Sequence, residues 1–176
     1  MEMSKSFGST VFSVGEYVVY GASGVCKIVG TEKKCFDGKN ENTYYKMYPE
    51  GSESSVYYVP TDTDKLRTLM TKEQVKGLMD EIPAVEPIWS NNTNERKALF
   101  GSMLKSDDSK ILVCLIKSLY MRKFNHDRCG KKLSAYDEGI LRAAENMVFR
   151  EFAAVLNTPP ENIKDYFMGK VEEIPA

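Results

Sequence analysis

The chain has one histidine, one tryptophan and four cysteines among its 176 residues. The cysteines Cys26, Cys35, Cys114 and Cys129 have no CxxC spacing, so the common Cys/His zinc frameworks are excluded and the thiols are interpreted as reduced. No run of about 18 apolar residues is present, which excludes a transmembrane helix. The first ten residues lack the apolar stretch of a secretory signal, so we expect a cytoplasmic protein.

The sequence also lacks the patterns of common catalytic and cofactor sites. It contains neither a Walker-type phosphate loop nor the glycine fingerprint of dinucleotide-binding folds. The single histidine, His126, lies in a charged stretch at 125–132 that is interpreted as a loop without a nucleophile nearby. Asp107 and Asp108 are interpreted as caps of a helix start rather than as metal ligands. We therefore predict no enzymatic activity, no cofactor and no bound metal.

Charge is balanced over the whole chain and unbalanced within it. The sequence has 24 basic and 25 acidic residues, and residues 1–80 contain 10 of the former and 11 of the latter. Residues 96–132, in contrast, hold ten basic and three acidic residues, which gives a local excess of seven positive charges (10 − 3). Such a segment is compatible with binding to nucleic-acid phosphates and equally compatible with a solvated helical face.

The first half of the sequence predicts five short strands separated by turns. The expected strands cover residues 17–20, 25–33, 43–48, 55–59 and 66–69, with turn residues at 21–24, 37–40 and 49–52. In the pairs Tyr44-Tyr45 and Tyr57-Tyr58, one member is expected to enter the core because side chains alternate along a strand. We predict a small SH3-like or Tudor-like β-barrel as an N-terminal domain over residues 1–70.

The second half predicts helices, so the fold class is α+β. Thr71 and Gln74 form a capping-box pattern that begins a helix, and Pro83 and Pro87 end it. The expected helix and linker at 71–94 carry the single tryptophan, Trp89. Further helices are expected at 95–105, 108–124 and 134–157, with a last one ending near Gly169, as an all-α bundle at 95–176. Trp89 either plugs the seam between the domains or inserts into a partner.

Three blocks of the sequence resemble the CarD family (also called CdnL) of bacterial transcription regulators. The first is the stretch FSVGEYVVYGASGV at residues 12–25, a motif shared with the N-terminal module of the transcription-repair coupling factor. The second is the strand end Tyr58-Val59-Pro60. The third combines Trp89 and Arg96 with LSAYD at 133–137 and the stretch at 141–144. The resemblance covers residues 12–156.

The resemblance implies a function and a set of residues. The Tudor-like module is expected to dock on the RNA polymerase β subunit, and the helical domain to contact promoter DNA at the upstream edge of the melted bubble. There the tryptophan is expected to enter the minor groove and to stabilise the open complex. The residues implied to bind polymerase are Lys33, Lys34 and Tyr58. The residues implied to bind DNA are Trp89, Arg96, Lys97, Lys131 and Lys132.

The chain departs from the family pattern at several of these places. Tyr58 stands where some relatives have an arginine, Asn91 and Asn92 follow Trp89 where arginines are common, and Glu138 replaces a lysine of some relatives. Two alternatives therefore stay open beside the regulator: a polymerase-docking adaptor with little DNA contact, and a free-standing nucleic-acid-binding module. We expect a monomer.

Overall fold

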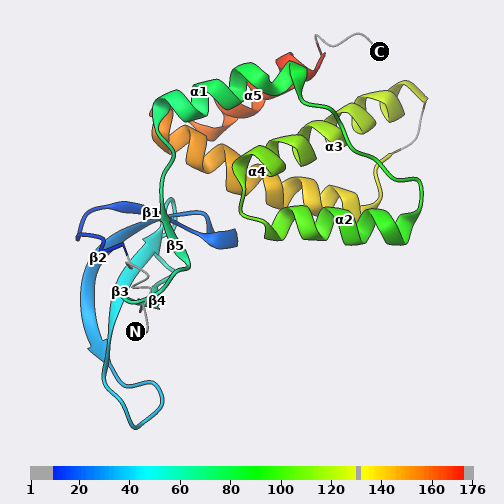
Figure 1. The fold of residues 1–176 in the computed structure, drawn as a ribbon. Coiled ribbons are helices and arrows are strands. Elements are labelled where there is room, and N and C mark those ends of the chain that lie inside the picture. Colours follow the sequence, from blue (N-terminus) through cyan, green and yellow to red (C-terminus); the bar gives the residue numbers. More distant parts are fainter. Residues whose placement is uncertain (1–9, 130–131, 173–176) are drawn as a thin grey trace, which may run out of the picture. The chain divides into compact units, whose positions relative to one another are not determined.

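The computed structural model describes residues 10–125 and 132–172 in full, together with the helical backbone of 126–129 (Figure 1). The chain divides into two compact units, residues 1–69 and 70–176, which are described separately. The first contains a five-stranded antiparallel sheet and the second contains helices. The predicted α+β class, with a β-rich N-terminal unit before a helical one, is confirmed.

The sheet of the first unit has the strand order β4-β3-β2-β1-β5. Its strands are β1 (Tyr17–Tyr20), β2 (Val25–Lys34), β3 (Asn42–Pro49), β4 (Tyr57–Pro60) and β5 (Leu66–Thr68), with a short 3-10 turn η1 (Gly21–Ser23) after β1. The five predicted strands are all found, and their ends differ from the prediction by no more than two residues. Gly24 in the turn before β2 has φ 72°, a backbone conformation that favours glycine.

One face of the sheet holds the core of the first unit. Ile28 of β2 lies opposite Met47 of β3, and both side chains are fully buried. Tyr45 is buried as well, and its hydroxyl accepts a hydrogen bond from the Phe12 backbone N–H at 3.1 Å. Tyr44 beside it is only half-buried, so this pair alternates across the sheet as predicted.

A β-bulge changes which residues of β2 lie on the core side. Ile28 pairs with Met47, but the next paired residue of β2 is Gly30, opposite Lys46. The extra residue, Val29, shifts the alternation by one position. Beyond the bulge the even-numbered residues of β2 therefore lie on the outer face, together with Tyr44 and Lys46 of β3.

The described part of the second unit contains five α-helices. They are α1 (Lys72–Glu81), followed by the 3-10 turn η2 (Ile82–Ala84), α2 (Thr93–Lys105), α3 (Ser109–Cys129), α4 (Ala135–Leu156) and α5 (Pro160–Glu172). The prediction of a loop at 125–132 was wrong for its first part, because α3 continues to Cys129 and His126 lies on that helix. No proline or glycine precedes Gly130 in α3, so nothing in the sequence stops the helix earlier. Helix α5 also runs three residues past Gly169, to Glu172.

Local capping fixes where three of these helices begin. The Thr71 hydroxyl accepts from the Gln74 N–H at 3.2 Å, and the Gln74 side chain accepts from the Thr71 N–H at 2.9 Å, which confirms the capping box. Asp108 accepts from the Lys110 N–H at 2.9 Å, as its interpretation as a cap requires. Ser134 accepts from the Asp137 N–H at 3.1 Å at the start of α4.

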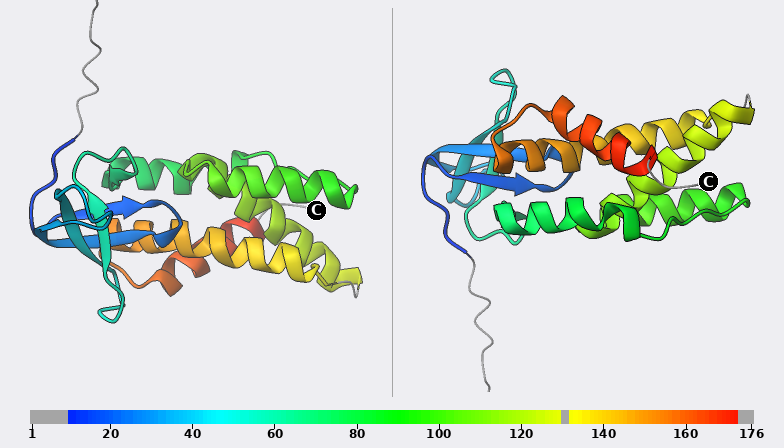
Figure 2. Two further views of the ribbon diagram at one scale, coloured as in Figure 1. Left: turned by 90° about the horizontal axis from the view of Figure 1, so that it is seen from below. Right: turned by 90° about the horizontal axis from the view of Figure 1, so that it is seen from above.

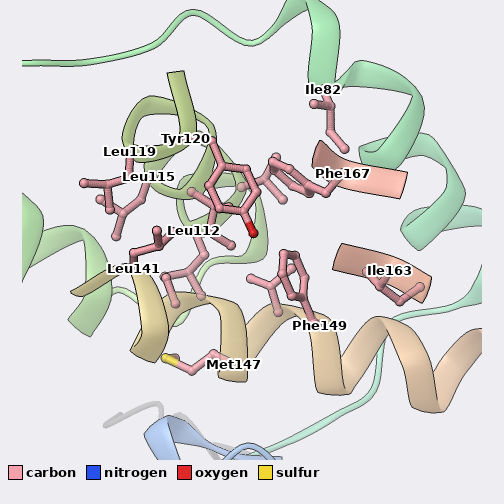
Figure 3. Packing of buried hydrophobic residues seen from close by; sticks show 14 of the residues in the cluster. Ile82, Leu112, Leu115, Leu119, Tyr120, Leu141, Met147, Phe149, Ile163 and Phe167 are labelled. Atoms are coloured by element: carbon pink, nitrogen blue, oxygen red, sulfur yellow. The ribbon is translucent and has the colours of Figure 1, made fainter. Parts of the chain in front are cut away.

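The helices pack around one apolar core (Figure 3). Helix α3 lies along α4, and α4 along α5 (Figure 2). Leu115 and Leu119 of α3 lie on the side of the core toward Leu141 of α4, while Phe149 and Phe167 bring α4 and α5 together with rings 5.7 Å apart. These five side chains are almost completely buried.

The segment expected as a separate helix and linker at 71–94 is part of the second unit. Val75 and Met79 of α1 are buried in the helical core, and so is Ile82 in the turn that follows. Trp89 packs against the same core. The prolines end α1 as predicted, but the chain beyond them stays on the helical bundle rather than leaving it.

Candidate functional site

An aromatic patch lies on the outer face of the sheet and consists of Lys34, Phe36, Tyr44 and Tyr58. The Lys34 ammonium lies 4.0 Å from the centre of the Tyr58 ring, a cation-π contact. The Phe36 ring meets Tyr44 edge-on at 4.9 Å and Tyr58 at 6.2 Å. Phe36 is nevertheless 64% exposed. The patch thus offers a large apolar ring to solvent beside a positive charge, a combination typical of protein-binding surfaces.

Ion pairs hold the charged side of the aromatic patch. Glu32 lies between Lys34 and Lys46, with N–O distances of 3.3 and 3.4 Å. Partial desolvation opposes ionisation of Glu32, but the two lysines outweigh it and lower the pKa of its carboxyl. Interaction with Tyr58 is the largest cause that raises the pKa of Lys34, partial desolvation opposes it, and Glu32 adds to it. Lys34 is therefore held in its charged form next to the aromatic rings.

The structure separates the two lysines that the resemblance assigned to polymerase. Lys34 pairs with Asn42 and lies on the outer face, whereas Lys33 pairs with Thr43 and follows the opposite alternation. Lys33 is exposed and lies on the side of the strand that Tyr45 occupies further along. Of the expected polymerase-binding residues, the structure brings Lys34 and Tyr58 together and leaves Lys33 apart.

Trp89 lies half-buried on the helical unit. Its ring packs edge-on against the buried Phe100 of α2, with ring centres 5.8 Å apart. The guanidinium carbons of Arg96 and Arg122 lie 4.6 and 4.7 Å from the indole centre. The indole N–H is buried without a hydrogen-bond partner among the described residues. The tryptophan is thus neither sealed in the core nor a freely projecting wedge.

Arg96 is committed to contacts within the helical unit. Its Nε donates to Asp137 of α4 at 3.2 Å, one terminal nitrogen donates to the Ser90 carbonyl at 3.0 Å, and the residue is only 9% exposed. Asp137 is almost fully buried. A buried ion pair of this kind joins α2 to α4 and fixes the chain beside Trp89.

The other expected DNA-binding residues lie at different places. Lys97 is exposed and its ammonium lies 5.3 Å from the centre of the Tyr136 ring. Lys132 is exposed. Lys131 lies outside the described residues. The structure therefore brings Trp89 and Arg96 together, while Lys97 lies on an aromatic ring of α4 instead.

Much of the positive charge of residues 96–132 is engaged within the unit. Lys110 pairs with Glu81 at 3.6 Å, and Lys123 pairs with Glu138 at 3.8 Å. Lys117 is buried and donates to two backbone carbonyls. Together with Arg96, four of the eight cations of this segment whose side chains the structure describes are occupied. Neither sequence interpretation, phosphate binding or a solvated face, applies to Lys117, because burial removes it from the surface.

Sequence reasoning missed Phe36, Arg122 and Lys117. Phe36 had a signal, because an apolar aromatic at the start of a polar turn is unusual. Arg122 and Lys117 gave none, since each is one cation among many on a helix. Their partners lie about 30 residues away in the chain, at Trp89 and at the Pro83 and Val85 carbonyls.

Other kinds of site find little support in the described part of the chain. No three histidine, cysteine, aspartate or glutamate side chains among these residues are grouped as ligands for a metal ion. None of the described helices has the length and apolar character needed to cross a bilayer.

Comparison with protein families matches residues 12–72 to the CarD-like/TRCF RID domain. No curated protein matches the chain. The matched region contains the whole sheet and the complete aromatic patch, and ends at the first residue of α1. The first unit of the chain therefore belongs to the CarD-like/TRCF RID domain family, which makes this an RNA polymerase-interacting, transcription-related protein.

Proposed function

We propose that the chain is a non-enzymatic, cytoplasmic regulator that docks on the RNA polymerase β subunit and stabilises the open promoter complex through DNA contact at the upstream edge of the bubble. The observation that carries this proposal is the exposed aromatic patch within the matched domain. In this patch Phe36 provides an apolar anchor, Lys34 provides a positive charge and Tyr58 provides a hydroxyl group.

Docking through the aromatic patch requires that polymerase contacts the outer face of β2. Aromatic anchors surrounded by polar groups supply most of the affinity in many protein interfaces. Phe36 would supply buried apolar area, and Lys34 would supply charge complementarity to an acidic surface. Lys33 on the opposite face would contribute only long-range attraction.

Charge reversal on the two faces of β2 tests this docking mode. Lys34→Glu should abolish co-purification with polymerase, because it places a second acidic group beside Glu32 and removes the cation from the Tyr58 ring. Lys33→Glu is the matched control, since it makes the same change one residue away on the other face. Equal loss of binding in both variants would contradict docking through the patch.

The DNA half of the proposal depends on Trp89 and its neighbours. The half-buried indole lies next to Arg122, whose guanidinium carbon is 4.7 Å from the ring centre and which has no ion pair with any described residue. An aromatic surface backed by a cation suits a distorted base step flanked by phosphates. If this surface fits the melted junction better than duplex DNA, it shifts the equilibrium toward the open complex by that difference in free energy.

The second candidate function is a polymerase-docking adaptor whose helical unit serves another protein. It is favoured by the commitment of Arg96 to Asp137 and by the partial burial of Trp89, which both reduce what is offered to DNA. Under the first function, Trp89→Ala shortens the lifetime of the open complex and leaves polymerase affinity nearly unchanged. Under the second, promoter melting is unaltered.

The Trp89→Ala experiment needs a companion because the ring also packs on Phe100. Arg122→Gln removes the unpaired cation beside the indole and leaves the apolar packing in place. Open-complex lifetimes for both variants, measured at a temperature where each is folded, separate lost DNA contact from lost stability. Wild-type lifetimes in both variants would refute DNA contact at Trp89 and favour the adaptor.

A further inference from the structure

The segment that ends at Trp89 cannot form all the hydrogen bonds of its backbone N–H and C=O groups within itself. Residues 83–89, here called the tryptophan segment, contain Pro83 and Pro87, which have no N–H to donate. Only the first part of the segment belongs to a short 3-10 turn, and the rest has no regular structure. Backbone carbonyls and amides held against a core need partners from elsewhere.

Helix α3 supplies those partners from one of its faces. The buried Lys117 ammonium donates to the Pro83 carbonyl at 2.9 Å and also to the Val85 carbonyl. Ser118 accepts from the Ile88 N–H at 2.8 Å. The Cys114 thiol donates to the Glu86 carbonyl at 3.4 Å.

These contacts follow the spacing of a helix and end at the tryptophan. Cys114, Ser118 and Arg122 are each four residues apart, so they form one stripe along α3. Their partners advance in the same direction, from Glu86 through Ile88 to the ring of Trp89. Lys117 lies beside this stripe and holds the beginning of the segment.

The role of Lys117 is unusual for a lysine. It is 2% exposed, and it forms no ion pair with any described residue. Burying a cation away from counter-ions costs free energy unless its surroundings supply hydrogen-bond acceptors. Here the surroundings are two carbonyls of the segment that leads to Trp89.

We propose that Lys117 and Ser118 are positioning residues that fix Trp89 on the surface of the helical unit by holding the tryptophan segment against α3. The consequence for promoter opening rests on the proposed function, whereas the positioning itself does not. Trp89 is the single tryptophan of the chain, so its fluorescence reports its position directly.

The experiment compares the full chain with Lys117→Met and Ser118→Ala. Lys117→Met keeps the apolar stem and removes the donor of both carbonyl bonds, and Ser118→Ala removes the partner of the Ile88 N–H. We expect tryptophan emission at longer wavelength and stronger acrylamide quenching in both variants, because the released segment exposes the indole. Helical circular dichroism should be retained at the temperature of the measurement.

Two control variants separate positioning from general loss of charge or stability. Lys105→Met removes an exposed lysine, and Ile163→Val trims a buried apolar side chain of α5. Neither should change the emission. Unchanged emission and quenching in Lys117→Met and Ser118→Ala, or an equal change in Ile163→Val, overturns the proposal. If Lys117→Met does not fold, Ser118→Ala decides alone.

The open-complex lifetime then tests the link to function separately. With polymerase and promoter, we expect Lys117→Met to shorten the lifetime by up to about tenfold. Altered emission with a wild-type lifetime leaves the positioning role intact and refutes the proposed DNA contact at Trp89. Unaltered emission refutes the positioning role whatever the lifetime.

Discussion

At the scale of single residues, Arg96 joins three parts of the helical unit through Asp137, the Ser90 carbonyl and the Trp89 ring. Arg96→Met leaves the Asp137 carboxylate buried without its cation, so we expect the free energy of unfolding to fall by about 3 kcal/mol. Urea unfolding followed by circular dichroism measures the loss. The neighbouring exposed Lys97→Met should stay within about 0.5 kcal/mol of wild type. Wild-type stability of Arg96→Met would show that the ion pair does not stabilise the fold.

The thiol of Cys26 gives the first unit a pH dependence. Burial raises the pKa of this thiol from 9.0 to about 11. Above pH 9 the unfolded chain loses this proton while the folded chain keeps it, so stability present below pH 9 is lost as pH rises toward 11. The loss is on the order of 2–3 kcal/mol from this group.

Unfolding free energies of wild type and Cys26→Ala, measured from pH 8 to pH 11, test this. Other groups titrate in both proteins, so only the difference between the two curves belongs to Cys26. We expect wild type to lose stability more steeply than Cys26→Ala above pH 9. Parallel curves would rule out a contribution from this thiol.

Residue roles were predictable only where the partner is near in sequence or where alternation decides. The expectations that one of Tyr44 and Tyr45 enters the core and that Asp108 caps a helix needed no knowledge of distant residues. The resemblance identified Arg96 but not its commitment to Asp137, which lies 41 residues away. The sequence shows which chemical groups a side chain carries, whereas the residue that binds those groups depends on how the chain packs.

At the scale of elements, the start of α1 depends on reciprocal hydrogen bonds between Thr71 and Gln74. Thr71→Ala removes the hydroxyl that accepts from the Gln74 N–H in the first turn, so we expect it to destabilise the helical unit by about 1 kcal/mol. Urea unfolding monitored by Trp89 fluorescence reports on this unit, which contains both residues. Lys72→Ala, an exposed change at the next position, should have an effect below about 0.5 kcal/mol. Equal effects of the two changes would contradict the capping role.

Strands and most helices were predictable because their signals are local. The capping box, the turn residues and the apolar spacing all lie within a few residues of the element that they define. Residues 125–129 were misassigned because charge was taken as the mark of a loop, although charged residues without glycine or proline continue a helix. The tryptophan segment was expected as a linker because its partners in α3 lie about 30 residues away.

At the scale of the whole molecule, the near-neutral charge limits binding to DNA. The net charge is −1, and four of the eight cations of residues 96–132 with described side chains are occupied within the helical unit. We expect weak binding to free duplex DNA at physiological salt, and clear DNA contact only in the complex with polymerase. Docking raises the local concentration of the helical unit near the promoter, which compensates for weak phosphate contacts.

Salt titrations with free duplex and with the ternary complex test this expectation. Few phosphate contacts predict a shallow dependence of the binding constant on salt for free DNA. Tight binding to duplex without polymerase, with a steep salt dependence, would instead favour a free-standing nucleic-acid-binding module.

The bulge at Val29 has a consequence for anyone who grafts the aromatic patch onto another scaffold. On a regular hairpin without a bulge, Ile28 and Lys34 would lie on the same face of the sheet, because they are an even number of positions apart. The Lys34 ammonium would then point into the interior of the scaffold. A transplanted copy must therefore include the extra residue or move its charged positions by one. Insertions beyond the strand end, in the turn at 37–40, do not change which face of the sheet each residue of β2 occupies.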